Sequence, residues 1–104
     1  MSGFDQETDG NVDTRSRDEV KRPRRFKVLL HNDHYTSMEF VVMILETVFR
    51  KSSPESLEIM LSVHQQGVGL AGVYPAAVAE TKMNRVHVEA EGQGFPLKCS
   101  MEPE

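Results

Sequence analysis

The chain has 104 residues, a formal net charge of -4 and one cysteine, Cys99. This length allows one domain with a single modest core. The negative charge argues against a nucleic-acid partner, and no apolar run approaches the roughly 20 residues of a membrane span. A lone cysteine cannot form an internal disulfide, so we expect a reducing compartment, the cytoplasm.

Residues 1–24 are predicted to form a flexible extension, because they contain one aromatic residue, two valines and no sustained hydrophobic period. So little apolar surface does not offset the entropy cost of ordering. The second half of this segment is basic with acidic residues interleaved, which fits a solvated linker better than a patch for an acidic partner. Residues 25–104 then form one folded domain.

The segment RFKVLLHND, from Arg25 onward, predicts a short strand that ends in a polar loop. Four ligand-capable side chains follow one another there: His31, Asn32, Asp33 and His34. Such a cluster could bind a metal ion, carry acid/base chemistry, hold a charged ligand or cap a helix.

A helix is predicted directly after this loop, ending near Arg50. Thr36 and Glu39 have the spacing of a capping box, and Tyr35 and Phe40 stand at the two positions of a hydrophobic staple around it. The predicted apolar stripe of this helix consists of Met38, Val41, Val42, Leu45, Val48 and Phe49.

A second helix is predicted from Pro54, with Ser53 as its N-cap and Gly67 as the residue that ends it. One face of this helix carries Leu57, Met60, Leu61 and His64 at i, i+3, i+4 and i+7. Taken alone, a histidine in such a stripe is more often a hydrogen-bonded core residue than a ligand.

The rest of the chain predicts a strand in VGLAGVY, a third helix in PAAVAETKMNRVHVEAEGQG and a last strand in FPLKCSMEP. Leu97, Cys99 and Met101 alternate with polar residues, so Cys99 is expected to be a buried small hydrophobe. The order β-α-α-β-α-β predicts an α+β domain with three helices packed against a small three-stranded antiparallel sheet.

A metal site in the polar loop is disfavoured. His31 and His34 lie three residues apart in a turning segment, where side chains point to opposite faces, and no second Cys/His pair at ligand spacing follows. We therefore expect no metal and no cofactor.

Recognition of a ligand is the remaining functional interpretation of the loop. If the first two helices pack side by side, Met38, Met60 and His64 converge with Asn32 and Asp33 into a Met-lined bowl with a polar, partly anionic rim. Methionine is flexible and polarizable, which suits a pocket for several large side chains. Plain core packing of the two methionines is the alternative.

Four stretches in this order, NDHYTSMEFVV, IMLSVHQQGVG, AGVYPAAVAETK and FPLKCSMEPE, closely resemble the ClpS family. That family consists of bacterial adaptors that deliver N-degron substrates to the ClpAP protease. The resemblance spans residues 26–104 and implies a non-enzymatic α+β core behind a mobile N-terminal extension.

The resemblance also implies roles for individual residues. Residues implied to lie around the free α-amino group of the ligand are Asn32, Asp33, His34, Thr36 and His64. The implied wall of a pocket for a first residue Phe, Tyr, Trp or Leu consists of Met38, Val41, Met60, Val63 and Leu97. Glu80 and Lys82 would contact the N-terminal domain of the unfoldase ClpA.

Two positions depart from the family pattern. His34 stands where a second aspartate is common, and Ala77 stands where an acidic residue is usual on the face toward ClpA. Two other functions remain open. One is an N-degron-binding module without ClpA delivery, and the other is a small metal-dependent hydrolase using His31, Asp33, His34 and His64.

Overall fold

The structure is a computed structural model that describes residues 24–104. The extension predicted over residues 1–24 lies outside the described residues apart from Arg24. The elements are β1 (Arg25–His31), α2 (Met38–Thr47), α3 (Ser53–Gln66), β2 (Val68–Pro75), α4 (Ala76–Gln93) and β3 (Lys98–Pro103). This order confirms the predicted α+β architecture. No helix in the described part is long and apolar enough to cross a membrane.

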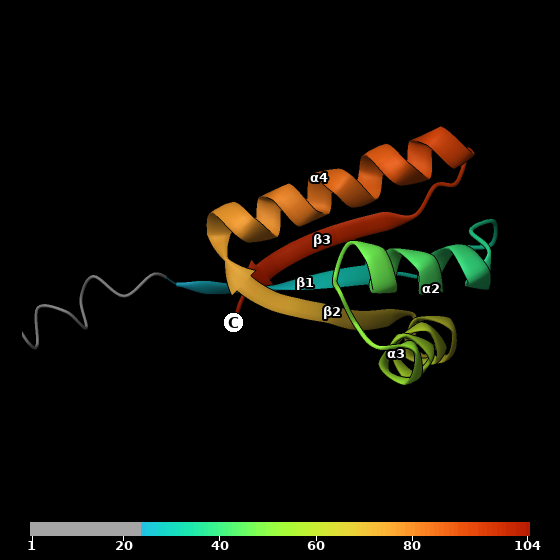
Figure 1. Ribbon diagram of the computed structural model, residues 1–104, viewed down its shortest axis with the longest axis horizontal. Coiled ribbons are helices and arrows are strands. Elements are labelled where there is room, and N and C mark those ends of the chain that lie inside the picture. Colours follow the sequence, from blue (N-terminus) through green and yellow to red (C-terminus); the bar gives the residue numbers. More distant parts are fainter. Residues whose placement is uncertain (1–23) are drawn as a thin grey trace, which may run out of the picture.

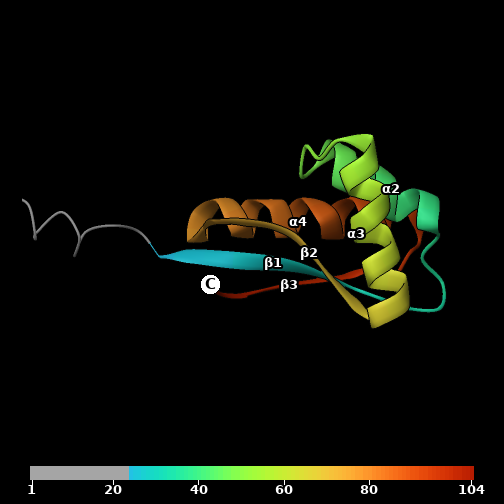
Figure 2. The ribbon, with the colours of Figure 1, turned by 90° about the horizontal axis from the view of Figure 1, so that it is seen from below.

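The sheet has the strand order β2-β1-β3, with both outer strands antiparallel to β1. Helix α4 lies along one face of the sheet, and α2 lies on the same side (Figures 1 and 2). Helix α3 sits at the end of the sheet where β1 finishes and β2 starts. The C-terminus returns to the start of β1, where the Arg25 guanidinium donates two hydrogen bonds of 3.0 Å to the Glu104 carboxylate.

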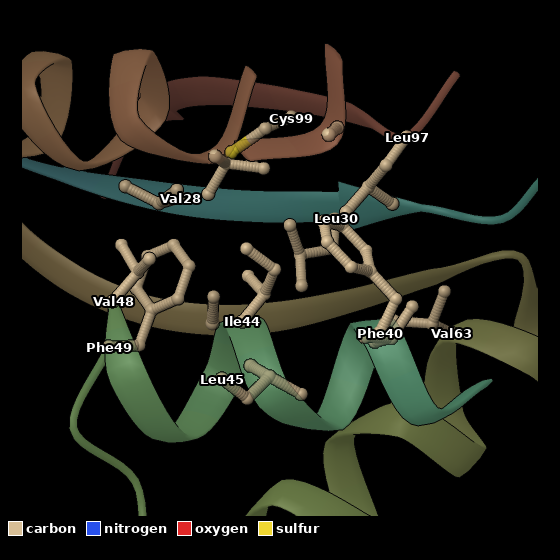
Figure 3. Close-up of a cluster of buried hydrophobic side chains, with 14 of the residues drawn as sticks. Val28, Leu30, Phe40, Ile44, Leu45, Val48, Phe49, Val63, Leu97 and Cys99 are labelled. Atoms are coloured by element: carbon tan, nitrogen blue, oxygen red, sulfur yellow. The ribbon is translucent and has the colours of Figure 1, made fainter. Parts of the chain in front are cut away.

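The core is centred on β1 and α2, and α3, β2, α4 and β3 also contribute buried residues to it. Val28 and Leu30 are fully buried on β1 and point toward Phe40 and Ile44 of α2 (Figure 3). The predicted stripe of α2 is therefore wrong in part, because it omitted Phe40 and Ile44 and included Met38, which is 48% exposed. A strictly periodic pattern fits more than one face of an apolar helix, and the position of the sheet decides which face is inside.

The prediction that Cys99 is a buried small hydrophobic residue is confirmed, since only 4% of it is exposed. Burial raises the pKa of its thiol to about 12. The thiolate, which is the nucleophilic form, is therefore scarce at neutral pH.

The N-terminus of α2 differs from the prediction by one residue. Ser37, not Thr36, is the N-cap, and its hydroxyl accepts a 3.1 Å hydrogen bond from the Phe40 amide. Tyr35 is 77% exposed, so the predicted hydrophobic staple is absent from this helix start. The helix also ends at Thr47, before the predicted end.

The N-terminus of α3 is likewise shifted. Ser52 rather than Ser53 is the N-cap, and it forms a capping box with Glu55. Glu55 stands three residues after Ser52, which is the spacing that a capping box requires. Gly67 ends α3 in the left-handed conformation, as predicted, with φ 89°.

The buried face of α3 is also rotated from the predicted one. Its buried residues are Ser56, Met60 and Val63. Leu57 and Leu61 are about half exposed, and His64 is exposed. His64 is thus not a core histidine but stands at the surface in the last turn of α3.

Candidate functional site

The end of β1 is fastened to the end of α3. The Asn32 amide donates a 2.9 Å hydrogen bond to the Gly67 carbonyl, and the Gly67 amide donates a 3.0 Å bond to the Val63 carbonyl. His64 directly follows Val63. These bonds therefore hold the polar loop after β1 beside the last turn of α3.

A cavity of about 500 Å³ opens between this loop, the start of α2 and the second half of α3. Its lining residues are Asn32, Asp33, His34, Tyr35, Thr36, Ser37, Met38, Glu39, Val41, Met60, Val63 and His64. The structure thus brings together all five residues assigned to the amine and four of the five assigned to the apolar wall. The bowl inferred from Met38, Met60 and His64 is present.

Leu97 is the residue of the predicted wall that does not line this cavity. It is 4% exposed and lies in the core near Leu30 and Phe40 (Figure 3). Leu97 directly precedes β3, and its alternation with Cys99 predicted an inward position; β3 pairs with β1 on the side opposite β2. Leu97 therefore packs in the core and does not line this cavity.

The walls of the cavity are apolar and its rim is polar. Val41, Met60 and Val63 are at most 8% exposed and come from the facing sides of α2 and α3. Asn32 and His64 are exposed at the rim. The cavity can therefore accept an apolar group together with an adjacent hydrogen-bond donor.

The carboxylate of Asp33 organises the rim. Its Oδ1 accepts hydrogen bonds from the amides of Tyr35 (2.8 Å) and Thr36 (2.7 Å), and its Oδ2 accepts one from the Thr36 hydroxyl (2.7 Å). Partial burial alone would raise the pKa of this carboxyl, but these bonds and the nearby His34 together lower it below its usual value. Asp33 therefore carries a negative charge at neutral pH while it fixes the loop.

Three further residues line the cavity although the sequence assigned them no role in it: Tyr35, Ser37 and Glu39. Tyr35 had been placed in the hydrophobic staple, and Glu39 in the capping box. The local sequence carries no signal that separates a capping glutamate from a cavity residue. Only the packing of α3 against α2 reveals it.

The four residues of the hydrolase alternative do not all converge, because Asp33, His34 and His64 line the cavity but His31 does not. His31 Nε2 lies 2.7 Å from the Ser100 hydroxyl of β3 and does not line the cavity. Within residues 24–104, no three His, Cys, Asp or Glu side chains gather where they could hold a metal ion. The geometry therefore favours recognition of an organic ligand.

The two residues assigned to docking lie on α4 and do not line the cavity. Glu80 is exposed. The Lys82 ammonium donates a 2.8 Å hydrogen bond to the Val48 carbonyl at the end of α2 and stands 5.3 Å from the centre of the Tyr74 ring. Lys82 thus fastens α4 to α2, a structural role that the sequence did not predict.

A family model described as ATP-dependent Clp protease adaptor protein ClpS matches residues 21–100. The chain belongs to the ClpS family. ClpS proteins are adaptors and not enzymes, which confirms the resemblance seen in the sequence and the prediction of a non-enzymatic role.

Individual ClpS proteins match along all or most of the chain. The ClpS of Desulfatibacillum aliphaticivorans is 61% identical over 104 residues and covers all of both chains. The ClpS of Myxococcus xanthus is 51% identical over 100 residues, 94% of each chain. The solved structure of Agrobacterium tumefaciens ClpS2 bound to L-phenylalaninamide superposes with a TM-score of 0.77 at 38% identity, over 80% of this chain and 100% of that one.

Proposed function

We propose that the cavity binds the free N-terminal residue of N-degron proteins, with Phe, Tyr, Trp or Leu in the first position, for delivery to the ClpA unfoldase of the ClpAP protease. The observation that carries this proposal is the meeting of apolar walls and an acceptor-rich rim in one cavity of about 500 Å³. A bulky first side chain and a terminal ammonium are the two groups that such a cavity complements.

The rim suits an ammonium group. A terminal amine has a pKa of about 7.7–8.0, so at neutral pH it is mostly a cation with three N–H donors. Asn32 offers a carbonyl oxygen and neutral His64 a ring nitrogen, while the charged carboxylate of Asp33 lies in the same rim. The C-terminal end of α3, where His64 stands, adds the partial negative charge of its carbonyls.

The walls suit a large apolar side chain. Burying such a side chain contributes about 1.5–3 kcal/mol, and each charge-assisted hydrogen bond contributes about 1.5–3 kcal/mol. Association subtracts several kcal/mol, so we expect dissociation constants on the order of micromolar. The phenylalaninamide bound by the related Agrobacterium protein combines the same two features, an aromatic side chain and a free amine.

The test is a fluorescence titration with a Phe-peptide whose amine is free and with the same peptide N-acetylated. Acetylation removes the charge and most of the donors, so we expect affinity to fall at least tenfold. His64→Ala should weaken binding of the free peptide, whereas Gln65→Ala, at the exposed neighbouring position, should not. Equal affinity for the free and acetylated peptides contradicts the proposed mechanism.

Delivery to ClpA is the second half of the proposal. The exposed Glu80 on α4 lies outside the cavity, so one protein can hold a peptide and dock an unfoldase at the same time. Degradation of a Phe-bearing reporter by purified ClpAP, with and without the chain, separates delivery from mere sequestration. Acceleration supports delivery, and inhibition supports sequestration.

We assign these activities to a core over residues 25–104 and a role in handing over cargo to residues 1–24, which lie mostly outside the described residues. Deleting residues 2–23 should then preserve peptide affinity and slow degradation. We expect the protein to act in the reducing cytoplasm, because Cys99, the single cysteine of the chain, is a buried free thiol.

A further inference from the structure

One face of the sheet carries no helix and is called here the open face. Helices α2 and α4 lie on the other side of the sheet, and no helix within residues 24–104 lies along this one (Figure 2). Val28 and Leu30 of β1 point toward α2, so the residues that alternate with them point away from the helices. Residues paired directly across strands share a face. The open face therefore consists of Lys27, Leu29 and His31 of β1, Val68, Leu70 and Val73 of β2, and Lys98, Ser100 and Glu102 of β3.

The open face is apolar along β2 and charged along β3. Leu70 is 45% exposed and Val68 is 36% exposed, and Leu29 and Val73 are half-buried on the same face. A sheet face that stays in water is typically polar. Several apolar side chains that gather on one uncovered face are typical of an interaction surface.

We propose that the open face binds the open face of a second copy of the chain, which gives a weak two-fold dimer. The proposal does not depend on the function proposed for the cavity. Two sheets that pack face to face keep their strands within about 30° of each other, and a two-fold axis makes the contact self-complementary. The axis that fits this face runs across the strands, along the row formed by Leu70, Leu29 and Ser100.

This axis brings the apolar side chains together. Leu70 and Leu29 each lie opposite their own copy. Val68 and Val73 flank Leu70 on its two sides, because the bulge in β2 takes up the extra residue between Leu70 and Val73. Val68 of one chain therefore lies opposite Val73 of the second copy. The apolar β2 halves of the two faces thus cover each other.

The charges on β3 are the observation that favours a second copy over another occupant. Lys98 and Glu102 are both exposed and stand two residues before and two residues after Ser100. The same axis therefore places Lys98 of each chain opposite Glu102 of the other, so that the dimer contains this pair of opposite charges twice. The arrangement of charge on β3 is complementary to itself.

The central strand adds no charge attraction. Lys27 would lie opposite His31 of the second copy, while it remains paired with Glu102 of its own chain. The His31 ring is engaged at 2.7 Å with the Ser100 hydroxyl. Three strands also bury well under the about 800 Å² per partner of a standard interface, so we expect a dissociation constant of about 0.1–1 mM.

The dimer leaves the cavity and α4 accessible. None of the nine open-face residues lines the cavity. Helix α4 covers the opposite side of the sheet and would lie on the outside of the dimer (Figure 2). One dimer can therefore present two cavities and two α4 surfaces at once.

The experiment is sedimentation equilibrium of the full chain at concentrations up to about 2 mM, which spans the expected dissociation constant. Lys98→Glu and Glu102→Lys each place like charges opposite one another twice, so each should weaken the dimer about five- to thirtyfold. The double variant exchanges the two charges and should return to within about twofold of the parent. Arg85→Glu and Glu91→Lys, at exposed positions of α4, make the same changes in net charge and should have no effect.

Leu70→Lys tests the apolar half, because it places two ammonium groups opposite each other on the axis. It should abolish dimerisation, whereas Val88→Lys, at a valine of α4 that is 68% exposed, should not. A chain that stays monomeric over the whole range overturns the proposal, whether the open face is bare or residues 1–23 cover it. A double charge variant that dimerises no more tightly than the single variants also overturns it, as does a dimer that Leu70→Lys leaves unchanged.

Discussion

The carboxylate of Asp33 holds Thr36 with both of its oxygens, each at 2.7 Å, one from the Thr36 amide and one from its hydroxyl. Asp33 therefore fixes the conformation of the rim in addition to giving it a negative charge. Its Oδ1 already accepts two hydrogen bonds, whereas its Oδ2 accepts one and keeps a lone pair for a ligand. The loop and the ligand site thus depend on the same charge.

This relationship predicts the pH behaviour of the rim. The folded-state pKa of Asp33 is lowered, so the stabilisation that it contributes is present above the ordinary aspartate pKa of about 3.9 and is lost as the pH falls through the lower folded value.

Thr36→Val removes one of the bonds to the Asp33 carboxylate. We expect an NMR titration of the Asp33 carboxyl to shift upward and Phe-peptide affinity to fall about three- to tenfold, whereas Thr36→Ser should preserve both. An unchanged titration in Thr36→Val would show that the hydroxyl is not engaged.

His34→Asp should tighten peptide binding. His34 is exposed on the rim, and a carboxylate there adds attraction for the ammonium, worth about three- to tenfold in affinity at low salt and less at high salt. Titrations at two salt concentrations measure this effect, with Asn84→Asp on the exposed side of α4 as the control for net charge. No gain in affinity would place the residue beyond reach of the amine.

Gly69→Ala should disturb Val63, a lining residue of the cavity, because Gly69 of β2 packs closely against it. A Cβ at this position of β2 would lie 2.6 Å from Val63 Cγ2 and 3.0 Å from the Ile59 carbonyl, so Val63 or the strand must move. We expect a loss of about 1–3 kcal/mol in the free energy of unfolding and weaker peptide binding.

The matched control for Gly69→Ala is Gly92→Ala. Gly92 lies within α4, and a Cβ there meets nothing within 4 Å. Urea denaturation should show a gain of about 0.5–1 kcal/mol for this variant. A Gly69→Ala protein as stable as the parent would mean that β2 and α3 are less closely packed in solution.

Substitutions of Lys82 and Glu80 should have different effects on stability and on ClpA docking. Lys82→Met keeps the aliphatic stem but leaves the Val48 carbonyl without its donor, so we expect about 0.5–1.5 kcal/mol lower stability. Glu80→Ala alters an exposed side chain and should change stability by less than about 0.5 kcal/mol while weakening ClpA docking. Thermal unfolding and a binding titration with the ClpA N-terminal domain measure the two properties. Full stability with lost docking in Lys82→Met would assign its ammonium to the partner instead.

The sequence by itself determined the element order, because hydrophobic period, proline, glycine and capping residues act over a few positions. Gly67 ended α3 where expected, and Cys99 alternated inward as expected. It also carried the family resemblance, which implied ten site residues, and nine of these line the cavity. Local rules placed both helix N-caps one residue away from their observed positions, because Thr36 and Ser37, like Ser52 and Ser53, compete for the same function.

Only the tertiary structure decided which helix faces are inside and which residues share a cavity. His64 belonged to an apolar stripe in the sequence, yet the packing of α3 buries the neighbouring face and leaves His64 at the rim. Leu97 resembled a wall residue but lies in the core, and Lys82 donates to Val48, 34 residues earlier in the chain. These relationships depend on the relative rotation of elements, which is set by the summed burial of the whole core and not by any local pattern.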